Sequence, residues 1–305
     1  MRFDVSEIKE FRGCTRKWEL TSRNRFHLQP KVTPPQFIFG TIFHEALHSL
    51  YMNTPLDKVM EGVRHEMCTD SDAALLAMIP GYAKEVLPED LDRFRVLDIE
   101  HKFDFVPEES DDPDLHICGS IDMIVLDPEA NKIYGFEHKT CKNFRDTTYM
   151  WMDEQPRVYT RALQQYIDEY NAKRHQEWMD NGSPIDAEPV PATLGGIYLN
   201  EVKKLLRQFQ YRRSLMVYPE DDLSNFFQHF VQSCKTCKHA AEEGRPGIPN
   251  PDWFKCQMCE YRTICETYQY QSLEKAKVLQ EFAEEFQERE TDHLDEKVER
   301  VNEGV

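Results

Sequence analysis

Residues 117–139 read ICGSIDMIVLDPEANKIYGFEHK, and the centre of the fold can be inferred from them. Residues 117–126 and 132–138 are rich in apolar side chains, whereas residues 127–131, Asp-Pro-Glu-Ala-Asn, have the composition of a turn. We therefore predict a β-hairpin whose strands occupy residues 117–126 and 132–138. From Val96 onward, apolar and charged residues alternate, which predicts a further strand just before the hairpin.

The segments around this hairpin have helical periodicity. Thr41–Met52 places its apolar residues at spacings of three and four, and a similar pattern extends from Glu154 to Trp178. The apolar run Gly196–Leu199 predicts one more strand. Because helices come before, between and after a small set of strands, the sequence predicts one α/β domain.

Composition excludes several classes of protein. No apolar run reaches the roughly 18 residues that a membrane-spanning helix needs, and the charged N-terminus does not resemble a secretory signal, so we expect a cytoplasmic protein with no membrane contact. Nine cysteines, an odd number, favour metal or cluster ligands over a disulfide framework in such a chain. The net charge of −18 argues against a general nucleic-acid binder. Residues 266–305 contribute −7 of it, from 12 acidic and 5 basic residues, so the acidity is partly local.

The predicted hairpin carries two carboxylates and a lysine that can meet. Glu137 and Lys139 are two residues apart on one strand and therefore share a face, and the partner strand can bring Asp122 beside Glu137. Paired carboxylates suit Mg²⁺ or Mn²⁺, which can bind a phosphate and its attacking water. The same residue types also occur on solvent-facing strands, so this pattern alone leaves both interpretations open.

Five short motifs occur in order along the chain. They are SEIKEFRGCTRKWEL (residues 6–20), FGTIFH (39–44), GSID (119–122), EHK (137–139) and QPRVY (155–159). Together they resemble the RecB-like branch of the PD-(D/E)XK nuclease superfamily, which includes CRISPR-associated iron–sulfur exonucleases and phage exonucleases. One departure is Thr15, which stands where that branch has a proline.

The resemblance implies a restriction-endonuclease-like α/β core over residues 1–270, with a small mixed central sheet flanked by helices. It also implies a metal-dependent DNA exonuclease of recombination, repair or phage DNA processing. In that family the residues that match Asp122, Glu137 and His44 bind Mg²⁺ or Mn²⁺, together with the backbone carbonyl that matches His138. The residues that match Lys139, Asp122 and Glu137 are catalytic. Glu100, on the strand before the hairpin, is a candidate additional ligand, with a solvated strand residue as the alternative.

Candidate DNA contacts follow the hairpin. By the resemblance, Gln155 and Tyr159 lie on a helix that positions DNA near the site. Lys142 and Arg145 come directly after the catalytic lysine and could contact phosphates. A second basic stretch, residues 203–213, includes two aromatic residues and is expected on a helix or turn. It could follow a single strand or simply face solvent.

The cysteines allow two metal sites. Cys256, Cys259 and Cys265 form a C-x2-C-x5-C run, and the resemblance implies that they and Cys14 hold a [4Fe–4S] cluster that ties the N- and C-terminal segments together. By spacing alone, a second pair could instead complete a structural Zn²⁺ site with the first two cysteines of this run. That pair is Cys234 and Cys237.

Two other functions remain open. His44-Glu45-Ala-Leu-His48 has the H-E-x-x-H pattern of zinc metalloproteases, in which both histidines bind zinc and the glutamate is the general base. A non-catalytic DNA-binding protein is the third hypothesis.

The C-terminal segment 271–305 is predicted to be an acidic amphipathic helix with a frayed tail. Apolar residues from Leu273 to Phe286 recur at spacings of three and four, and the pattern ends near residue 288. Such a helix could dock on the domain by its apolar stripe or bind a protein partner.

Overall fold

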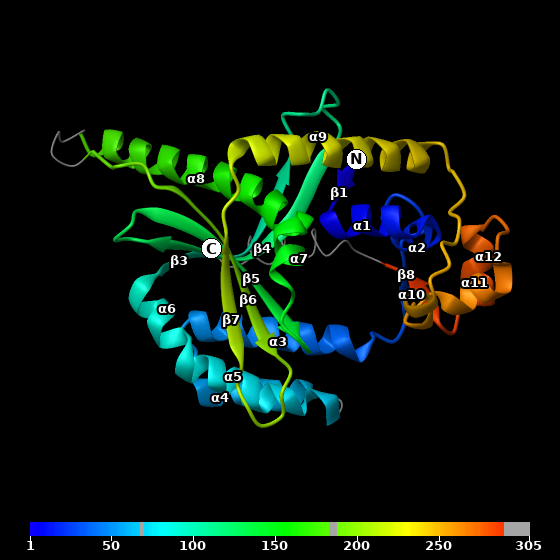
Figure 1. The fold of residues 1–305 in the computed structure, drawn as a ribbon, viewed down its shortest axis with the longest axis horizontal. Helices are drawn as coiled ribbons and strands as arrows, with labels where there is room; N and C mark the ends of the chain where they lie inside the picture. The colour runs from blue at the N-terminus through cyan, green and yellow to red at the C-terminus, as the bar shows by residue number, and fades with distance from the viewer. Residues whose placement is uncertain (68–69, 183–187, 290–305) are drawn as a thin grey trace. The chain divides into compact units, whose positions relative to one another are not determined.

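The computed structural model describes residues 1–67, 70–182 and 188–289 (Figure 1). These residues form two compact units, each built from segments that are distant in sequence. The first unit comprises Met1–Thr33, Asp104–Gly119 and the part of the chain from Ser224, and the second comprises Pro34–Phe103 and Ser120–Leu223. Within the described part of the C-terminal segment, residues 271–289 contribute Leu273, Val278 and Phe286 to a core of the first unit.

The second unit contains the predicted hairpin. Strands β4 (His116–Asp127) and β5 (Lys132–Cys141) pair antiparallel, and Met123 lies opposite Phe136. On the other side of β5, strand β6 (Thr193–Lys203) is parallel to it, and β7 (Tyr211–Met216) follows antiparallel to β6 at the edge of the sheet. Strand β3 (Arg95–Phe105) also pairs with β4. The sheet is therefore mixed, as expected.

Helices cover both faces of this sheet (Figure 1). On one face lie α3 (Pro35–Tyr51), α4 (Leu56–Glu66), the 3₁₀ turn η1 (Asp70–Ala74), α5 (Leu75–Glu85) and α6 (Leu87–Arg93), which share a buried core with the sheet. On the other face lie α7 (Thr147–Met152) and α8 (Glu154–Asp180). The side chain of Asp153 caps α8 by accepting a hydrogen bond from the backbone of Gln155, which fixes where this helix begins.

The first unit joins the two ends of the chain. Strand β1 (Arg2–Phe3) pairs in parallel with the start of β4, and β2 (Leu28–Pro30) pairs antiparallel with β8 (Phe286–Glu288). The helices of this unit are α1 (Val5–Gly13), α2 (Thr15–Thr21), most of α9 (Glu220–Glu242), α10 (Trp253–Gln257), α11 (Arg262–Tyr268) and α12 (Lys275–Glu281).

The C-terminal segment departs from its predicted conformation. Helix α12 is shorter than expected, and Phe286–Glu288 forms a strand rather than the end of a helix. The reason is tertiary: Val278 and Phe286 are buried in a core with Leu28 and Tyr261 from outside the segment. The apolar stripe thus packs inside the first unit, and a protein partner for this segment stays a prediction. The tail from residue 290 lies outside the described residues.

The basic stretch at residues 203–213 is also not a helix. Lys203 ends β6 and Tyr211 begins β7, so the stretch forms the connection and edge of a β-hairpin. Alternation along β7 sends Arg212 toward Glu201 and Arg213 toward Asp90, two partners on different elements. These partly buried ion pairs favour the strand over the predicted helix or turn.

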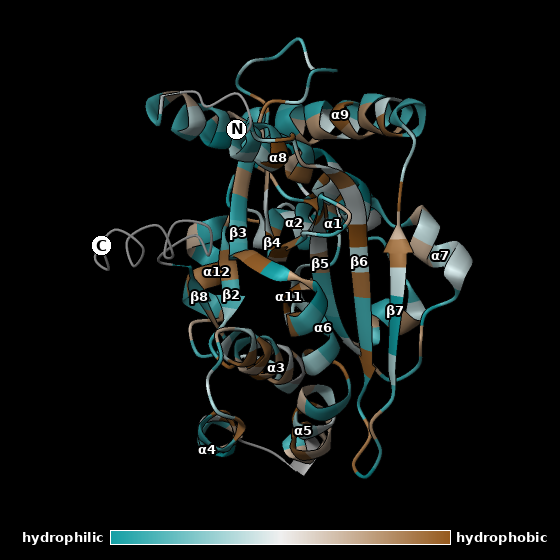
Figure 2. Ribbon diagram, turned by 90° about the vertical axis from the view of Figure 1, so that its left-hand side faces the viewer, coloured by the Kyte–Doolittle hydropathy of each residue, from teal (hydrophilic) through white to brown (hydrophobic). Residues whose placement is uncertain are grey.

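Hydrophobic stretches mark the buried elements of the second unit. Figure 2 shows them on strand β6 and helix α3. Of the described helices, none has the length and apolar character that crossing a membrane requires.

Candidate active site

Glu137 lies at the centre of the candidate site, on the face of β5 that α8 covers. Its side chain is 3% exposed. One carboxylate oxygen, Oε1, contacts Nζ of Lys139 and accepts a 3.1 Å hydrogen bond from Nε2 of Gln155. The other oxygen, Oε2, is buried and has no hydrogen-bond partner among the described residues. Burying a carboxylate oxygen without a hydrogen-bond partner costs free energy, so Oε2 is a candidate position for a ligand from outside the protein chain.

Asp122 faces the same site from strand β4. Its Oδ2 accepts a 2.7 Å hydrogen bond from the backbone N–H of His138, and its Oδ1 lies 3.6 Å from Nδ1 of His44 on α3. Burial alone would raise the pKa of Asp122, but the positive charge of His44 and its hydrogen bond to Asp122, with a smaller contribution from the charge of Lys139, hold that pKa at about 2. Asp122 is therefore ionised at neutral pH.

Glu137 responds in the opposite direction. Burial, followed by the negative charge of Asp122, raises the pKa of Glu137 to about 7, although Lys139 and His44 oppose that rise. The two carboxylates thus repel each other in a buried place, and Glu137 takes up a proton near neutral pH when no cation is bound. A divalent cation beside both would remove this repulsion.

His44 and Lys139 supply the positive charge of the site. Burial lowers the pKa of His44, but Asp122 and Glu137 outweigh burial and raise it overall. The pKa of Lys139 is likewise raised by Glu137 and Asp122 against the effect of burial. Lys139 is therefore a charged ammonium group held beside two carboxylates.

Glu100 lines the same cavity as His44 and Asp122, and its backbone conformation is unusual. Its φ of 52° lies in the left-handed region, which side chains other than glycine rarely adopt. Glu100, His44, His48, Asp122 and His138 all line one small cavity of about 10 Å³, about the space of one water molecule. The candidate ligands on α3, β3 and β4 therefore line one cavity without forming a closed metal-binding group among the described residues, and Glu100 stays a candidate ligand.

The side chain of His138 points to the opposite face of β5 from Glu137. Burial lowers the pKa of His138 to about 4, so the ring is neutral. Its Nδ1 lies 3.3 Å from Nδ2 of Asn200 on β6, and Oδ1 of Asn200 accepts a 2.7 Å hydrogen bond from Nε of Arg213. Asp90 binds Arg213 through two hydrogen bonds of 2.5 and 2.7 Å and also accepts one from Tyr51.

This buried network was not predicted from the sequence. Asn200 lies opposite His138 in the parallel pairing of β5 and β6, and Glu201 lies opposite Lys139. No local motif indicates either residue, because the register between two strands some 60 positions apart is set only in the folded chain.

The predicted DNA contacts have mixed surroundings. Nε2 of Gln155 also donates a 2.7 Å hydrogen bond to the hydroxyl of Tyr159, which is 7% exposed, so this pair supports Glu137 from within. Arg145 forms ion pairs with Asp153 at 3.0 Å and with Glu201 at 3.4 Å. The side chain of Lys142 is exposed. Of the four, Lys142 offers the most accessible charge to a phosphate.

The geometry on β4 and β5 agrees with a comparison of the sequence with protein families. A model of the PD-(D/E)XK nuclease superfamily matches residues 2–266. The chain belongs to the PD-(D/E)XK nuclease superfamily. Nucleases of this superfamily act on DNA and typically use Mg²⁺ or Mn²⁺.

Comparisons with individual proteins add little to the superfamily assignment. The chain is similar to a crystal structure from Eubacterium rectale described as a "putative exonuclease", with a TM-score of 0.49 and 12% sequence identity over 86% of each chain. A search of proteins with curated descriptions found no match.

The surroundings of the H-E-x-x-H pattern differ from what a zinc protease requires. His44 faces Asp122, whereas Glu45, which would have to be the general base beside zinc, is exposed. In the described parts of the chain, no three His, Cys, Asp or Glu side chains already form a group that could hold a metal ion. The pattern therefore lacks a formed third ligand for zinc.

The four cysteines that the resemblance selects are neighbours in the first unit. Cys14 lies between α1 and α2, Cys256 lies in α10, Cys265 lies in α11, and Cys259 lies in the connection between those two helices. Burial raises the pKa of Cys265 to about 11, with further contributions from the thiols of Cys259, Cys14 and Cys256. Burial also raises the pKa of Cys259, and the thiol of Cys14 contributes to that rise. The fold thus brings a distant cysteine beside the C-terminal run, although their thiols do not yet form a closed ligand group.

The second cysteine pair has other neighbours. Cys234 and Cys237 are fully buried on α9. Burial raises the pKa of Cys237. Glu7 and Cys234 raise it further, and a hydrogen bond with Trp18 opposes the rise. Because neither Cys256 nor Cys259 is among those neighbours, the surroundings of this pair do not favour the four-cysteine zinc site.

Proposed function

We propose that this protein is a metal-dependent DNA exonuclease of the RecB-like branch, which hydrolyses phosphodiester bonds. The observation that carries the proposal is the buried Oε2 of Glu137, which has no partner among the described residues and lies in a site shared with Asp122. The superfamily match supports hydrolysis of DNA. Recombination, repair and phage DNA processing are the pathways that the sequence resemblance suggests.

The donor set fits a hard divalent cation. Asp122 and Glu137 would hold Mg²⁺ or Mn²⁺, with His44, the backbone carbonyl of His138 and Glu100 as further candidates. An imidazole ligand suits Mn²⁺ better than Mg²⁺. When bound, such an ion supplies an activated water and neutralises charge on the phosphate.

Lys139 and Gln155 have distinct roles in the proposed reaction. The ammonium group of Lys139, kept protonated by Glu137 and Asp122, can donate a hydrogen bond to a phosphoryl oxygen as negative charge develops there. Gln155 binds Oε1 of Glu137 and so leaves Oε2 available to the cation. Gln155 is a positioning residue, since it acts through Glu137.

The test is digestion of end-labelled DNA with Mg²⁺, Mn²⁺ or a chelator. Replacing Asp122, Glu137 or Lys139 by Ala should each reduce cleavage by about 100-fold or more while the melting temperature changes little. Wild-type rates in all three variants would contradict the proposal. The matched control is Glu45→Gln, an exposed carboxylate beside His44: a nuclease should tolerate it, whereas a zinc protease should lose casein cleavage.

Exonuclease action can be separated from endonuclease action by topology. Linear DNA should be degraded from its ends, and a covalently closed circle of the same sequence should persist. Cleavage of the circle at the rate of the linear form would make the protein an endonuclease and leave the catalytic residues unchanged.

We also propose that Cys14, Cys256, Cys259 and Cys265 hold a [4Fe–4S] cluster with a structural role. The mutual effects of their thiols on one another's pKa support this ligand set. Because Cys14 lies near the N-terminus and the other three ligands lie some 240 residues later, a cluster bound to all four would close a long loop and restrain the unfolded chain.

A further inference from the structure

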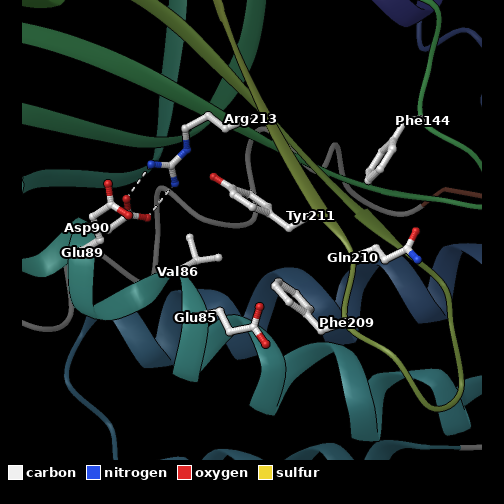
Figure 3. A pocket seen from close by; sticks show the side chains of 9 residues that line it. All are labelled: Glu85, Val86, Glu89, Asp90, Phe144, Phe209, Gln210, Tyr211 and Arg213. Carbon is white, nitrogen blue, oxygen red and sulfur yellow. Dashed lines mark hydrogen bonds and ion pairs between the residues drawn. The ribbon is translucent and has the colours of Figure 1, made fainter.

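A cavity of about 630 Å³ lies in the second unit, where β7 and the loop before it pass over α5 and α6 (Figure 3). This volume falls within the range of pockets that bind small organic groups. Aromatic rings and carboxylates line it, contributed chiefly by Phe144, Phe209, Tyr211, Glu85 and Glu89. None of these residues belongs to the metal-binding set of the proposed nuclease site.

The aromatic wall of the cavity is held in place. The rings of Phe209 and Tyr211 are nearly parallel, with centroids 6.2 Å apart and planes 12° apart, and Tyr82 packs its edge against both. Phe209 lies directly on Gly81 of α5, where a Cβ atom would come within 2.5 Å of the ring. The hydroxyl of Tyr211 donates a 3.2 Å hydrogen bond to Asn200. Rigid aromatic faces of this kind bind flat rings at low entropic cost.

The carboxylates of the cavity differ in their availability. Both carboxylate oxygens of Asp90 are bound by Arg213, as Figure 3 shows, and one of them also accepts a hydrogen bond from Tyr51. Glu85 and Glu89 are exposed, and their carboxylates have no hydrogen-bond or ion-pair partner among the described residues. Free acceptors beside aromatic faces suit a flat ring that carries N–H donors, and they repel a phosphate.

The guanidinium of Arg213 lines the cavity and is paired with Asp90, and further cationic side chains lie around Phe144. Nζ of Lys203 lies 4.4 Å from the centroid of Phe144, and the guanidinium of Arg212 lies 4.9 Å from it. Phe144 follows closely after Lys139 and the end of β5. Burial, followed by the charge of Lys142, lowers the pKa of Lys204, which indicates that these two lysines are also close. Arg212 is already paired with Glu201, which leaves Lys203, Lys204 and Lys142 beside the Phe144 end of the cavity as partners for a phosphate. Lysines beside the cavity and carboxylate acceptors within it match a nucleotide whose phosphate lies outside and whose base lies inside.

We propose that this cavity is a subsite for one nucleobase of a single DNA strand, separate from the site of hydrolysis. The base stacks on Phe209 and Tyr211, and Glu85 or Glu89 accepts a hydrogen bond from its exocyclic amino group. Cytosine, adenine and guanine carry such a group. Thymine has one N–H between two carbonyl oxygens, which a carboxylate repels, so thymine is disfavoured. This inference rests on the proposed action on DNA.

The test measures binding without hydrolysis. The full-length protein is titrated against fluorescent 12-mers of dC, dT or abasic sites in chelator at fixed salt, and the dissociation constants are read from anisotropy. Wild type should bind dC more tightly than dT, and both more tightly than the abasic strand. Phe209→Ala should weaken dC binding by roughly 5- to 100-fold relative to the wild-type protein. Phe209→Trp keeps an aromatic face at this position and should bind dC about as tightly as the wild-type protein does. The double variant Glu85→Gln/Glu89→Gln should bring the dC and dT affinities together.

Matched controls lie outside the cavity. Tyr270→Ala removes a ring that is 70% exposed, and Glu61→Gln neutralises an exposed carboxylate of α4; both should bind as wild type does. Equal binding of abasic and dC strands, or wild-type affinity in Phe209→Ala, would overturn the subsite while cleavage of linear DNA continued. A wild-type protein that neither binds nor cleaves DNA would overturn the proposed function and the subsite together.

Discussion

Gln155 holds Glu137 by a hydrogen bond of 3.1 Å from its side-chain amide to Oε1, and the same nitrogen reaches Tyr159 at 2.7 Å. The helix α8 thus fixes a carboxylate of the sheet from the side, and the unpartnered Oε2 is left for a cation. Groups that orient a metal ligand typically contribute 10- to 100-fold to affinity or activity.

The first prediction follows from this contact. Gln155→Ala should lower the cleavage rate at limiting Mn²⁺ by about 10- to 100-fold, with partial recovery at high Mn²⁺, because Glu137 loses its fixed orientation. Tyr159→Phe keeps the contact between Gln155 and Glu137 and serves as the control, with a much smaller effect. Rates against Mn²⁺ concentration distinguish the two variants. Equal losses in both, without rescue by Mn²⁺, would point to a general packing defect.

The second prediction concerns pH. In the metal-free protein the pKa of Glu137 is raised from 4.5 to about 7, so a proton occupies this carboxylate below that pH. A cation must displace the proton, and the affinity for Mn²⁺ should therefore rise about tenfold per pH unit up to about pH 7 and then level off. Calorimetry in buffers of different ionisation enthalpy should detect about one proton released per ion near pH 6.

The variant that sharpens this test is Lys139→Met. The ammonium group of Lys139 lowers the pKa of Glu137, so its loss should move the midpoint of Mn²⁺ binding to higher pH. A midpoint that stays in place or moves to lower pH would contradict the assignment of this titration to Glu137. Lys142→Met, which removes an exposed lysine just beyond the strand, should leave the midpoint unchanged.

The third prediction concerns the cysteines of the first unit. Protein purified without oxygen should be brown and contain about four irons per chain. Cys14→Ser should remove the iron and lower the melting temperature, because Cys14 and the C-terminal run are then no longer joined through the cluster. Cys237→Ala should keep the iron. Zinc without iron, lost in Cys237→Ala but kept in Cys14→Ser, would replace the cluster with the four-cysteine zinc site.

The fourth prediction tests the strand at the end of the described chain. Phe286 is 3% exposed and stacks on Tyr261 with ring centroids 5.2 Å apart. Phe286→Ala should therefore lower the free energy of unfolding by about 3–5 kcal/mol. Gln287→Ala, at an exposed position of the same strand, should change it by less than about 0.5 kcal/mol. Urea denaturation measures both, and similar small effects would place Phe286 outside the core.

Local sequence was sufficient for the parts of this protein that depend on neighbours along the chain. The hairpin of β4 and β5 follows from alternating apolar residues around a turn, and the pairing of Glu137 with Lys139 on one face follows from the two-residue period of a strand. Ordered motifs were enough to identify the nuclease superfamily, which the family comparison confirmed.

Other features exist only because distant segments meet in the folded chain. The parallel register of β5 and β6 places Asn200 beside His138, and no local pattern encodes that register. Phe286 lies in a strand rather than a helix because β2 offers it an edge with unpaired backbone groups and a buried core beneath. The sequence determined the chemistry that the chain carries. Tertiary structure decided which of those groups are buried together, and burial sets the pKa of Glu137 and its need for a cation.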